Sequence, residues 1–212
     1  MNGRIGRAGR AADAMISPQR GSHGRRPAVF LDRDGTLIED LPYLSDPVGI
    51  RLLPGAAEAL VRLRQAGFAR VLVTNQSGIG RGLFTEDRLR EIHAELESQL
   101  AARSASLDGI YYCPAAPVEG AGADCPDRKP APGMLLRGAD ELGIDLGASW
   151  MVGDKMSDVL AGLNAGCRSI LLQAGRADEA EPDDPVATGR FLVAPDLATA
   201  VDLILADRRS SG

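Results

Sequence analysis

Short, mainly apolar runs alternate along the chain with longer segments in which apolar residues recur every three or four positions. The longer pattern is typical of amphipathic helices, and the short runs are typical of strands buried on both faces of a sheet. We predict strands at 28–32, 70–74, 109–113, 149–153, 168–172 and 190–194. We predict helices at 54–66, 85–103, 132–142, 156–165 and 195–206. This alternation favours an α/β fold, here a Rossmann-like three-layer α/β/α arrangement with a mainly parallel sheet and no cap domain.

Charge is unevenly distributed and divides the chain. The 212 residues carry a net charge of −5, but residues 1–27 contain six arginines and one aspartate and lack any apolar periodicity. We therefore predict a disordered Arg-rich N-terminal tail at 1–27, a single domain at 28–206 and a C-terminal tail at 207–212. The tail also fits a nucleic-acid-binding arm, or an upstream start codon with translation beginning at Met15. The acidic domain argues against nucleic acid as the main partner.

Composition narrows the class of protein. No apolar run approaches the ~20 residues of a membrane span, and no signal-peptide segment is present. Only three cysteines occur, Cys113, Cys125 and Cys167, which does not suggest a disulfide framework. We expect a cytoplasmic monomer that binds neither membrane nor nucleic acid.

Polar and charged groups follow four of the predicted strands. In a parallel sheet the carboxyl ends of the strands meet at one edge, where ligands bind. The four groups, in chain order, are Asp32-Arg33-Asp34-Gly35-Thr36, Thr74-Asn75-Gln76-Ser77-Gly78, Arg128-Lys129-Pro130 and Gly153-Asp154-Lys155-x-x-Asp158. One such group fits a simple turn, but four in succession favour a site.

The paired acids of the first group need a partner. Residues two apart on a strand face the same way, so Asp32 and Asp34 are expected to point together. Two carboxylates a few Å apart repel by about 1–4 kcal/mol, and a divalent cation commonly offsets that repulsion. Asp and Gly are also common in turns, so the pair alone is equally compatible with a turn.

The lysines point to a bound anion. The chain has only two, Lys129 and Lys155, and both fall within these groups. A compact ammonium binds phosphate as a point charge, which a planar guanidinium does not imitate. Together with hard oxygen ligands, the lysines favour a phosphoryl group bound beside Mg²⁺.

A carboxylate is the natural nucleophile for such a site. His23 lies in the tail, and His93 lies in the middle of a helix, where we expect a surface position. No Ser–His or Cys–His pair is evident, whereas Asp and Glu can form acyl phosphates. A phospho-receiver signalling domain uses similar groups, but in another order and without the second lysine. A dinucleotide site is the third reading, but the spacing of Gly78, Gly80 and Gly82 does not fit it.

The four groups resemble, in order, the motifs of the haloacid dehalogenase (HAD) superfamily. The first two are similar to the group that contains histidinol phosphatases and heptose bisphosphate phosphatases. The phrases at 108–114, 128–135 and 151–155 look most like the heptose bisphosphatases, and the resemblance covers about residues 27–205. It implies a Mg²⁺-dependent phosphomonoester hydrolase that acts through an aspartyl-phosphate intermediate. The implied substrate is D-glycero-D-manno-heptose 1,7-bisphosphate, cleaved at its 7-phosphate in nucleotide-heptose biosynthesis; histidinol phosphate or another small sugar phosphate is the alternative.

The resemblance also implies roles for individual residues. Asp32 would be the nucleophile, Asp34 the general acid and base, and Asp158 a supporting residue. The implied catalytic residues are Asp32, Asp34, Thr74 and Lys129. The implied metal ligands are Asp32, Asp154 and, through its backbone carbonyl, Asp34. The implied substrate contacts are Asp40, Tyr43, Asn75, Gln76, Ser77, Arg128 and Lys155.

The segment 113–130 departs from its relatives and is the candidate lid. Heptose bisphosphatases usually carry a zinc loop of pattern Cys-x-His followed by Cys-x-Cys. Here Cys113 and Cys125 remain, but Ala115 and Asp127 stand where the histidine and the last cysteine would be. Structural zinc is almost always four-coordinate. We therefore expect no structural zinc, with the prolines of the loop supplying its rigidity.

Overall fold

A computed structural model describes residues 24–117, 125–173 and 191–210. Residues 1–23 of the predicted tail at 1–27 and the segment 118–124 of the candidate lid lie outside these residues. Residues 24–27, which the sequence assigned to the tail, are described. Arg26 forms a parallel bridge with Ile144, and its guanidinium donates to Asp108 at 3.1 Å.

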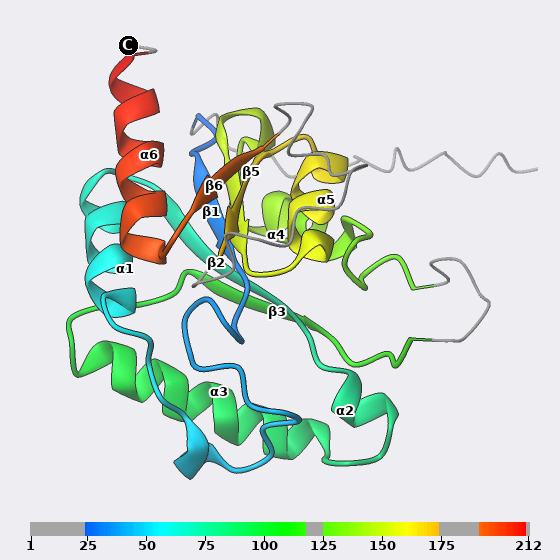
Figure 1. Ribbon diagram of the computed structural model, residues 1–212. Helices are drawn as coiled ribbons and strands as arrows, with labels where there is room; N and C mark the ends of the chain where they lie inside the picture. The colour runs from blue at the N-terminus through cyan, green and yellow to red at the C-terminus, as the bar shows by residue number, and fades with distance from the viewer. Residues whose placement is uncertain (1–23, 118–124, 174–190, 211–212) are drawn as a thin grey trace, which may run out of the picture.

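Six strands form one sheet (Figure 1). They are β1 (Ala28–Leu31), β2 (Ala69–Asn75), β3 (Gly109–Cys113), β4 (Trp150–Gly153), β5 (Arg168–Leu172) and β6 (Leu192–Ala194). Their order is β3-β2-β1-β4-β5-β6, and every neighbouring pair is parallel. The structure thus confirms the predicted α/β class and the parallel sheet.

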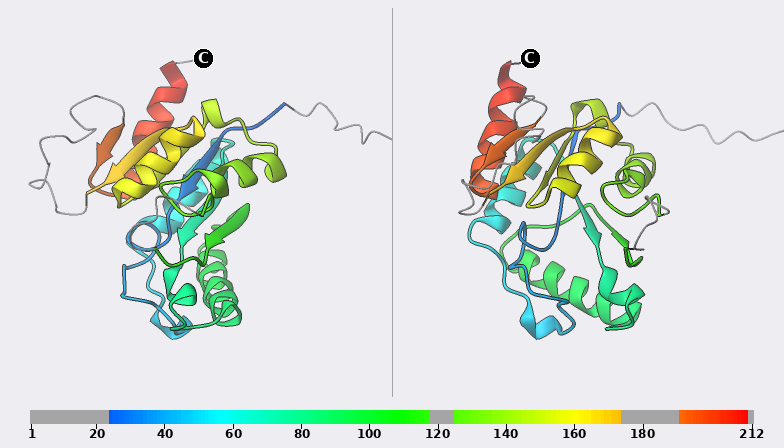
Figure 2. Two further views of the ribbon diagram at one scale, coloured as in Figure 1. Left: turned by 90° about the vertical axis from the view of Figure 1, so that its right-hand side faces the viewer. Right: turned by 45° about the vertical axis from the view of Figure 1, so that its right-hand side comes forward.

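Helices cover both faces of the sheet. The helices α1 (Ala56–Gln65), α3 (Glu86–Ala101) and α6 (Leu197–Ser210) share one apolar core with it. The helices α4 (Gly133–Leu142) and α5 (Met156–Ala165) share a second core on the other face. Figure 2 shows the cyan α1 and red α6 across the sheet from the yellow-green α4 and yellow α5.

Strand β1 shows why a strand of this sheet can be apolar at every position. Val29 and Leu31 pack into the core of α1, α3 and α6, whereas Ala28 and Phe30 pack into the core of α4 and α5. Successive side chains of a strand point to opposite faces, and here both faces are covered. The uninterrupted apolar run is therefore a direct consequence of the three layers.

Several boundaries differ from the predicted ones. The helix α1 begins at Ala56 rather than at residue 54, because Gly55 takes a left-handed conformation before it. The helix α6 continues to Ser210, past the predicted end at 206, and its Asp207 pairs with Arg168 of β5. The Thr85 side chain caps α3 by accepting from the Arg88 amide, as its sequence indicates.

Three short elements were not predicted. They are α2 (Ser77–Gly80) and the 3₁₀ helices η1 (Pro47–Gly49) and η2 (Leu146–Ala148). The chain from β1 to α1 contains only loop and η1, with no folded cap between them. Among the helices that the structure describes, none has both the length and the apolar character needed to cross a bilayer.

Candidate active site

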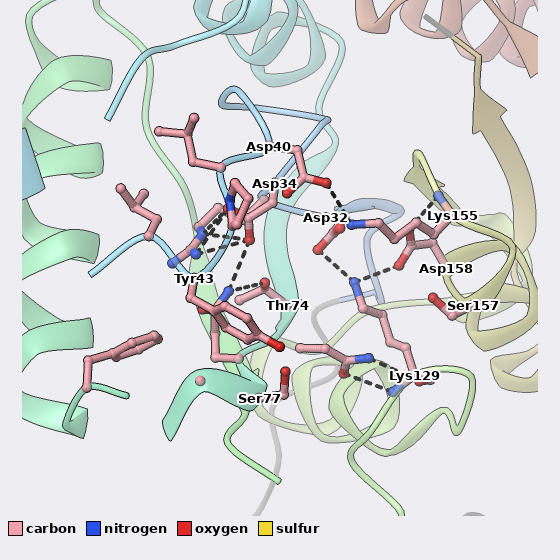
Figure 3. A pocket seen from close by; sticks show the side chains of 18 residues that line it. Asp32, Asp34, Asp40, Tyr43, Thr74, Ser77, Lys129, Lys155, Ser157 and Asp158 are labelled. Carbon is pink, nitrogen blue, oxygen red and sulfur yellow. Dashed lines mark hydrogen bonds and ion pairs between the residues drawn. The ribbon is translucent and has the colours of Figure 1, made fainter. Parts of the chain in front are cut away.

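A cavity of about 220 Å³ opens at the carboxyl edge of the sheet (Figure 3). This is the edge at which β1 and β4 lie side by side and the strand order reverses direction, the usual ligand site of an open α/β sheet. Most of the residues singled out from the sequence line it, namely Asp32, Asp34, Asp40, Tyr43, Thr74, Asn75, Gln76, Ser77, Lys129, Lys155 and Asp158.

Lys129 lies at the centre of the cavity floor and is almost fully buried. Its ammonium contacts Asp32 Oδ1 and Asp158 Oδ1, each at 2.7 Å, and donates to the Val73 carbonyl at 2.8 Å. Burial alone would lower the pKa of Lys129, but Asp32 and Asp158 outweigh that effect and raise it. All three of its hydrogens therefore have acceptors, and the group stays charged.

Three carboxylates form a candidate metal centre. Asp32, Asp154 and Asp158 each offer an oxygen, and these atoms lie within 4.8 Å of one another. Asp154 Oδ1 is buried and makes no hydrogen bond to the described residues. Burial, with the charges of Asp32 and Asp158 adding to it, raises the pKa of Asp154 to about 6. An unsatisfied buried carboxylate oxygen beside other acids is the environment that Mg²⁺ fits.

Asp158 differs from the other two acids, because both of its oxygens already have partners. Oδ1 contacts the Lys129 ammonium, and Oδ2 accepts from the Lys155 amide at 3.0 Å. Burial and then the charge of Asp32 raise the pKa of Asp158 to about 6, against the attraction of Lys129. Its geometry fits the supporting role expected from the sequence, in which it holds Lys129.

Glycines make room for these acids. A Cβ atom on Gly35 would lie 2.4 Å from Asp154 Oδ2, and one on Gly153 would lie 2.3 Å from Asp158 Oδ2. Gly35 also has a positive φ of 75°, which other residues rarely adopt. Gly35 therefore allows an acid just after β4 to approach the backbone, and Gly153 allows an acid in the first turn of α5 to do the same.

Asp34 faces the cavity but does not belong to the carboxylate cluster. Arg33 donates to both of its oxygens, and Gln76 Nε2 donates to Oδ2 at 3.1 Å. Burial is the main cause that raises the pKa of Asp34, and the charge of Arg33 opposes it. The raised pKa makes the protonated form of Asp34 easier to populate than that of an exposed aspartate.

Two residues expected to contact substrate instead hold their neighbours. Asn75 donates to the Lys129 carbonyl at 3.0 Å and accepts from the Lys129 amide at 3.1 Å. Gln76 donates to Thr74 Oγ1 at 2.8 Å as well as to Asp34. Both amide side chains therefore orient catalytic candidates in this structure, although both also line the cavity.

The mouth of the cavity is polar on one side and apolar on the other. Lys155 donates to Asp40 at 3.1 Å, and both side chains are about half exposed. Burial would lower the pKa of Lys155, but Asp154 and Asp40 together raise it. Tyr43 is 49% exposed, and the neighbouring Leu41 is 39% exposed. A ligand can contact these side chains at the mouth while the buried residues of the cavity keep their positions.

Arg128 is not among the residues that line the cavity. Its guanidinium donates instead to the Ala115 carbonyl at 2.8 Å, which ties it to the end of β3. Nearby, the Cys113 and Cys125 sulfurs lie 3.4 Å apart, while Asp127 pairs with Arg137. The substrate contact of Arg128 and the absence of zinc both remain predictions.

Sequence reasoning missed some residues of the site. Arg33, Ser157 and Phe84 line the cavity, and no role was expected of them, although Arg33 stands inside the first motif. The expected surface position of His93 is wrong, because the side chain is only 7% exposed and its ring meets that of Tyr112. Its spacing on α3, four residues after the buried Leu89 and three before the buried Leu96, was the available signal.

Comparisons with known proteins agree with this geometry. A family model described as HAD-hydrolase-like matches residues 127–200. The D-glycero-beta-D-manno-heptose-1,7-bisphosphate 7-phosphatase of Yersinia pestis is 45% identical over 160 residues, which cover 73% of this chain and 85% of the relative. The enzyme of the same name from Pasteurella multocida is 46% identical over 155 residues, covering 71% and 84%. The chain belongs to this family of HAD-like phosphatases.

A solved structure agrees with the fold and the expected cation. This phosphatase matches the crystal structure of D,D-heptose 1.7-bisphosphate phosphatase from B. bronchiseptica with a TM-score of 0.73 and 35% identity. The match covers 85% of this chain and 99% of the other, and that protein is complexed with magnesium and phosphate. The family and the carboxylate cluster support Mg²⁺ as the cofactor. They do not support the receiver-domain and dinucleotide readings.

Proposed function

We propose that this phosphatase removes the 7-phosphate from D-glycero-beta-D-manno-heptose 1,7-bisphosphate, a step towards nucleotide-activated heptose. The choice of substrate rests on relatives of that name at 45% and 46% identity. The chemistry rests on one observation, the buried Lys129 ammonium that contacts Asp32 beside the unsatisfied oxygen of Asp154. We infer that the enzyme acts as a cytoplasmic monomer.

Asp32 is the proposed nucleophile. Lys129 binds its Oδ1, which leaves Oδ2 without that ion pair and free to attack phosphorus. The new bond joins Asp32 to phosphorus, while the bond from phosphorus to the sugar oxygen breaks. Attack by a carboxylate divides a very slow hydrolysis into two easier steps.

Asp34 is the proposed general acid and base. It gives its proton to the departing sugar oxygen, then takes a proton from the water that hydrolyses the aspartyl phosphate. Its side chain is only partly buried, with 16% exposed, so one side stays open to the cavity. Arg33 and Gln76 hold it in place during both transfers.

The anionic phosphoryl group needs positive charge around it. Lys129 supplies one fixed charge, and Thr74 supplies a hydroxyl donor that is almost fully buried. Mg²⁺ held by Asp32, Asp154 and the Asp34 carbonyl would neutralise the phosphoryl oxygens as a Lewis acid. Lys155, which pairs with Asp40 at the mouth of the cavity, is the proposed contact for the remainder of the substrate.

The test is phosphate release across a panel of phosphomonoesters with Mg²⁺. The panel contains both anomers of heptose 1,7-bisphosphate, histidinol phosphate and two simple hexose phosphates. We expect the highest kcat/KM for the beta anomer, with phosphate released from C7. A higher kcat/KM for histidinol phosphate would contradict the proposed substrate while leaving the phosphatase chemistry intact.

The Asp32→Asn variant separates enzyme chemistry from contamination. An amide is a poor nucleophile, so we expect turnover at least about 1,000-fold below wild type on every substrate. The far-UV circular dichroism of the variant should match wild type, because the change keeps the volume of the side chain. Activity above a thousandth of wild type would contradict the role of Asp32.

A further inference from the structure

Arg33 separates the two acids of the first motif, and its side chain is almost fully buried. Its Nε lies 3.2 Å from both Asp34 oxygens, and its Nη2 lies 3.1 Å from Oδ1 and 3.0 Å from Oδ2. A buried guanidinium is costly unless it is paired, and here Nε and Nη2 face one carboxyl group, whereas the buried Nη1 has no hydrogen-bond partner among the described residues. Arg33 therefore fixes the plane of the Asp34 carboxyl group as well as its position.

Other contacts tie Arg33 to the fold behind the cavity. Its backbone carbonyl accepts from the amides of Leu37 and Ile38, which close the turn after β1. His93 of α3 is buried nearby, where burial first and then the charge of Arg33 lower its pKa to about 3. A neutral ring can pack beside the guanidinium, whereas a second cation would repel it. Arg33 is thus fixed to the turn after β1 through its backbone, and His93 presents no competing charge to its side chain.

We propose that Arg33 is a positioning residue for the acid and base step, holding the Asp34 carboxyl group in line with the leaving oxygen. The inference rests on the proposed phosphatase function, but it holds for any phosphomonoester that the enzyme cleaves. In that step the phosphorus–oxygen bond breaks and its electron pair goes to the ester oxygen. The same oxygen takes the proton of Asp34, while an Asp32 oxygen bonds to phosphorus. A carboxyl group that can rotate would deliver this proton less often.

The nature of the leaving group distinguishes positioning from mere support of the fold. An alcohol leaves poorly without a proton, whereas p-nitrophenolate leaves without one. Loss of Asp34 positioning should therefore reduce kcat/KM for a sugar phosphate much more than for p-nitrophenyl phosphate. General loss of structure should reduce both to the same extent.

The test compares Arg33→Met with Arg70→Met on both substrates, using kcat/KM because it reports the first chemical step. Arg70 is a matched control, because it is also buried and pairs with an acid, Asp108, at 2.5 Å. It lies at the amino end of β2, whereas the cavity lies at the carboxyl ends of the strands. We expect Arg33→Met to lose about 100-fold on the sugar phosphate, the lower end of a general acid's contribution. The loss on p-nitrophenyl phosphate should stay below about 5-fold, and Arg70→Met should change both substrates alike.

Arg33→Lys provides a second measurement, because an ammonium keeps the charge but cannot bind both oxygens as a fork. We expect the same dependence on the leaving group at an intermediate size. An equal loss on both substrates, no loss, or failure of both Arg33 variants to fold would overturn the proposal. If wild type cleaves other sugar phosphates but not heptose bisphosphate, the proposed substrate is wrong. The Arg33 comparison is then made with the sugar phosphate that the enzyme does cleave, and it tests the role of Arg33 independently.

Discussion

At the residue scale, the shape of a cation matters as much as its charge. The Lys129 ammonium contacts two carboxylates at 2.7 Å and the Val73 carbonyl at 2.8 Å, in a site that leaves it almost no solvent. Those acceptors surround a compact group, whereas a guanidinium is planar and larger. The persistence of lysine in a chain with so many arginines has a steric reason here.

Replacement of Lys129 by Arg should therefore be severe although the charge is kept. We expect kcat/KM to fall by about 100-fold, comparable with the loss of one preorganised electrostatic donor. The matched control is Lys155→Arg at the half-exposed mouth of the cavity, where a longer side chain has room and the loss should stay within about 10-fold. Kinetics of Lys129→Arg close to wild type would show that only charge is needed.

The sequence predicted which residues form the site better than it predicted which groups their side chains hydrogen-bond to. Asp32, Thr74 and Asp154 lie at strand ends and Lys129 lies in the loop before α4, and the structure brings all four to one edge of the sheet. The position of a residue in the sequence does not show which neighbouring group its side chain will hydrogen-bond to. Asn75 turns to the Lys129 backbone, and Arg128 turns to the Ala115 carbonyl. These choices depend on distances of a few Å between segments far apart in the chain.

At the element scale, the junction of β4 and α5 depends on a glycine, which has no side chain. Gly153 ends β4, and Asp158 folds back over it to accept from the Lys155 amide. A Cβ on Gly153 would lie 2.3 Å from Asp158 Oδ2, closer than real contacts allow. The acid that holds Lys129 would have to move.

Gly153→Ala should therefore lower both stability and activity. We expect a loss of about 1–3 kcal/mol in the free energy of unfolding, as for other overpacked sites, and at least a 10-fold loss in kcat. The control is Gly147→Ala in η2, where the nearest atom to the added Cβ is 3.5 Å away and the change should stay within about 0.5 kcal/mol. Denaturant unfolding and steady-state kinetics measure both quantities. A Gly153→Ala variant that matches the control would contradict the clash.

Helix α3 carries a buried base whose protonation opposes folding. His93 has its pKa lowered from 6.5 to about 3, chiefly by burial. The unfolded chain takes up the proton below pH 6.5, while the folded chain stays neutral until about pH 3. Stability is therefore lost as the pH falls through that window, by about 2 kcal/mol between pH 7 and pH 5.

The His93→Gln variant tests this assignment. Its free energy of unfolding should fall by about 2 kcal/mol less than that of wild type between pH 7 and pH 5, because Gln does not titrate. Other groups that titrate in this range remain in both proteins and cancel in the comparison. An identical pH dependence in the two proteins would contradict a buried, neutral His93.

The elements themselves were largely predictable, and the exceptions share a cause. Strands at 109–113 and 168–172 and the helix at 156–165 fall where the pattern placed them, because the strands contain consecutive apolar residues and the helix repeats its apolar residues at helical spacing. The helix α2 and the two 3₁₀ helices are too short to show a period. The exact end of α6 depended on contacts with β5, which the helix pattern does not contain.

At the scale of the whole molecule, the sheet gathers like charges at one edge. Parallel strands and helices on both faces place carboxylate oxygens of Asp32, Asp154 and Asp158 within 4.8 Å of one another, although Asp32 is far from the other two in sequence. Lys129 offsets part of their repulsion. Binding of a divalent cation to the folded state alone should then stabilise the entire domain, by about 2.7 kcal/mol at 100 times the Kd.

Stabilisation by Mg²⁺ should also depend on pH, and its sign follows from Asp154. Its pKa is raised from 3.8 to about 6, chiefly by burial, so without metal this group destabilises the fold as the pH rises from 4 to 6. Mg²⁺ has to displace that proton at low pH, which weakens apparent binding about 10-fold at pH 5. At a fixed Mg²⁺ concentration we expect an increase in Tm of about 5–10 °C at pH 7.5 and a smaller one at pH 5.

Asp154→Asn should abolish the increase, whereas Glu58→Gln on the exposed face of α1 removes the same charge and should retain it. An equal increase in Asp154→Asn would place the cation elsewhere in the protein.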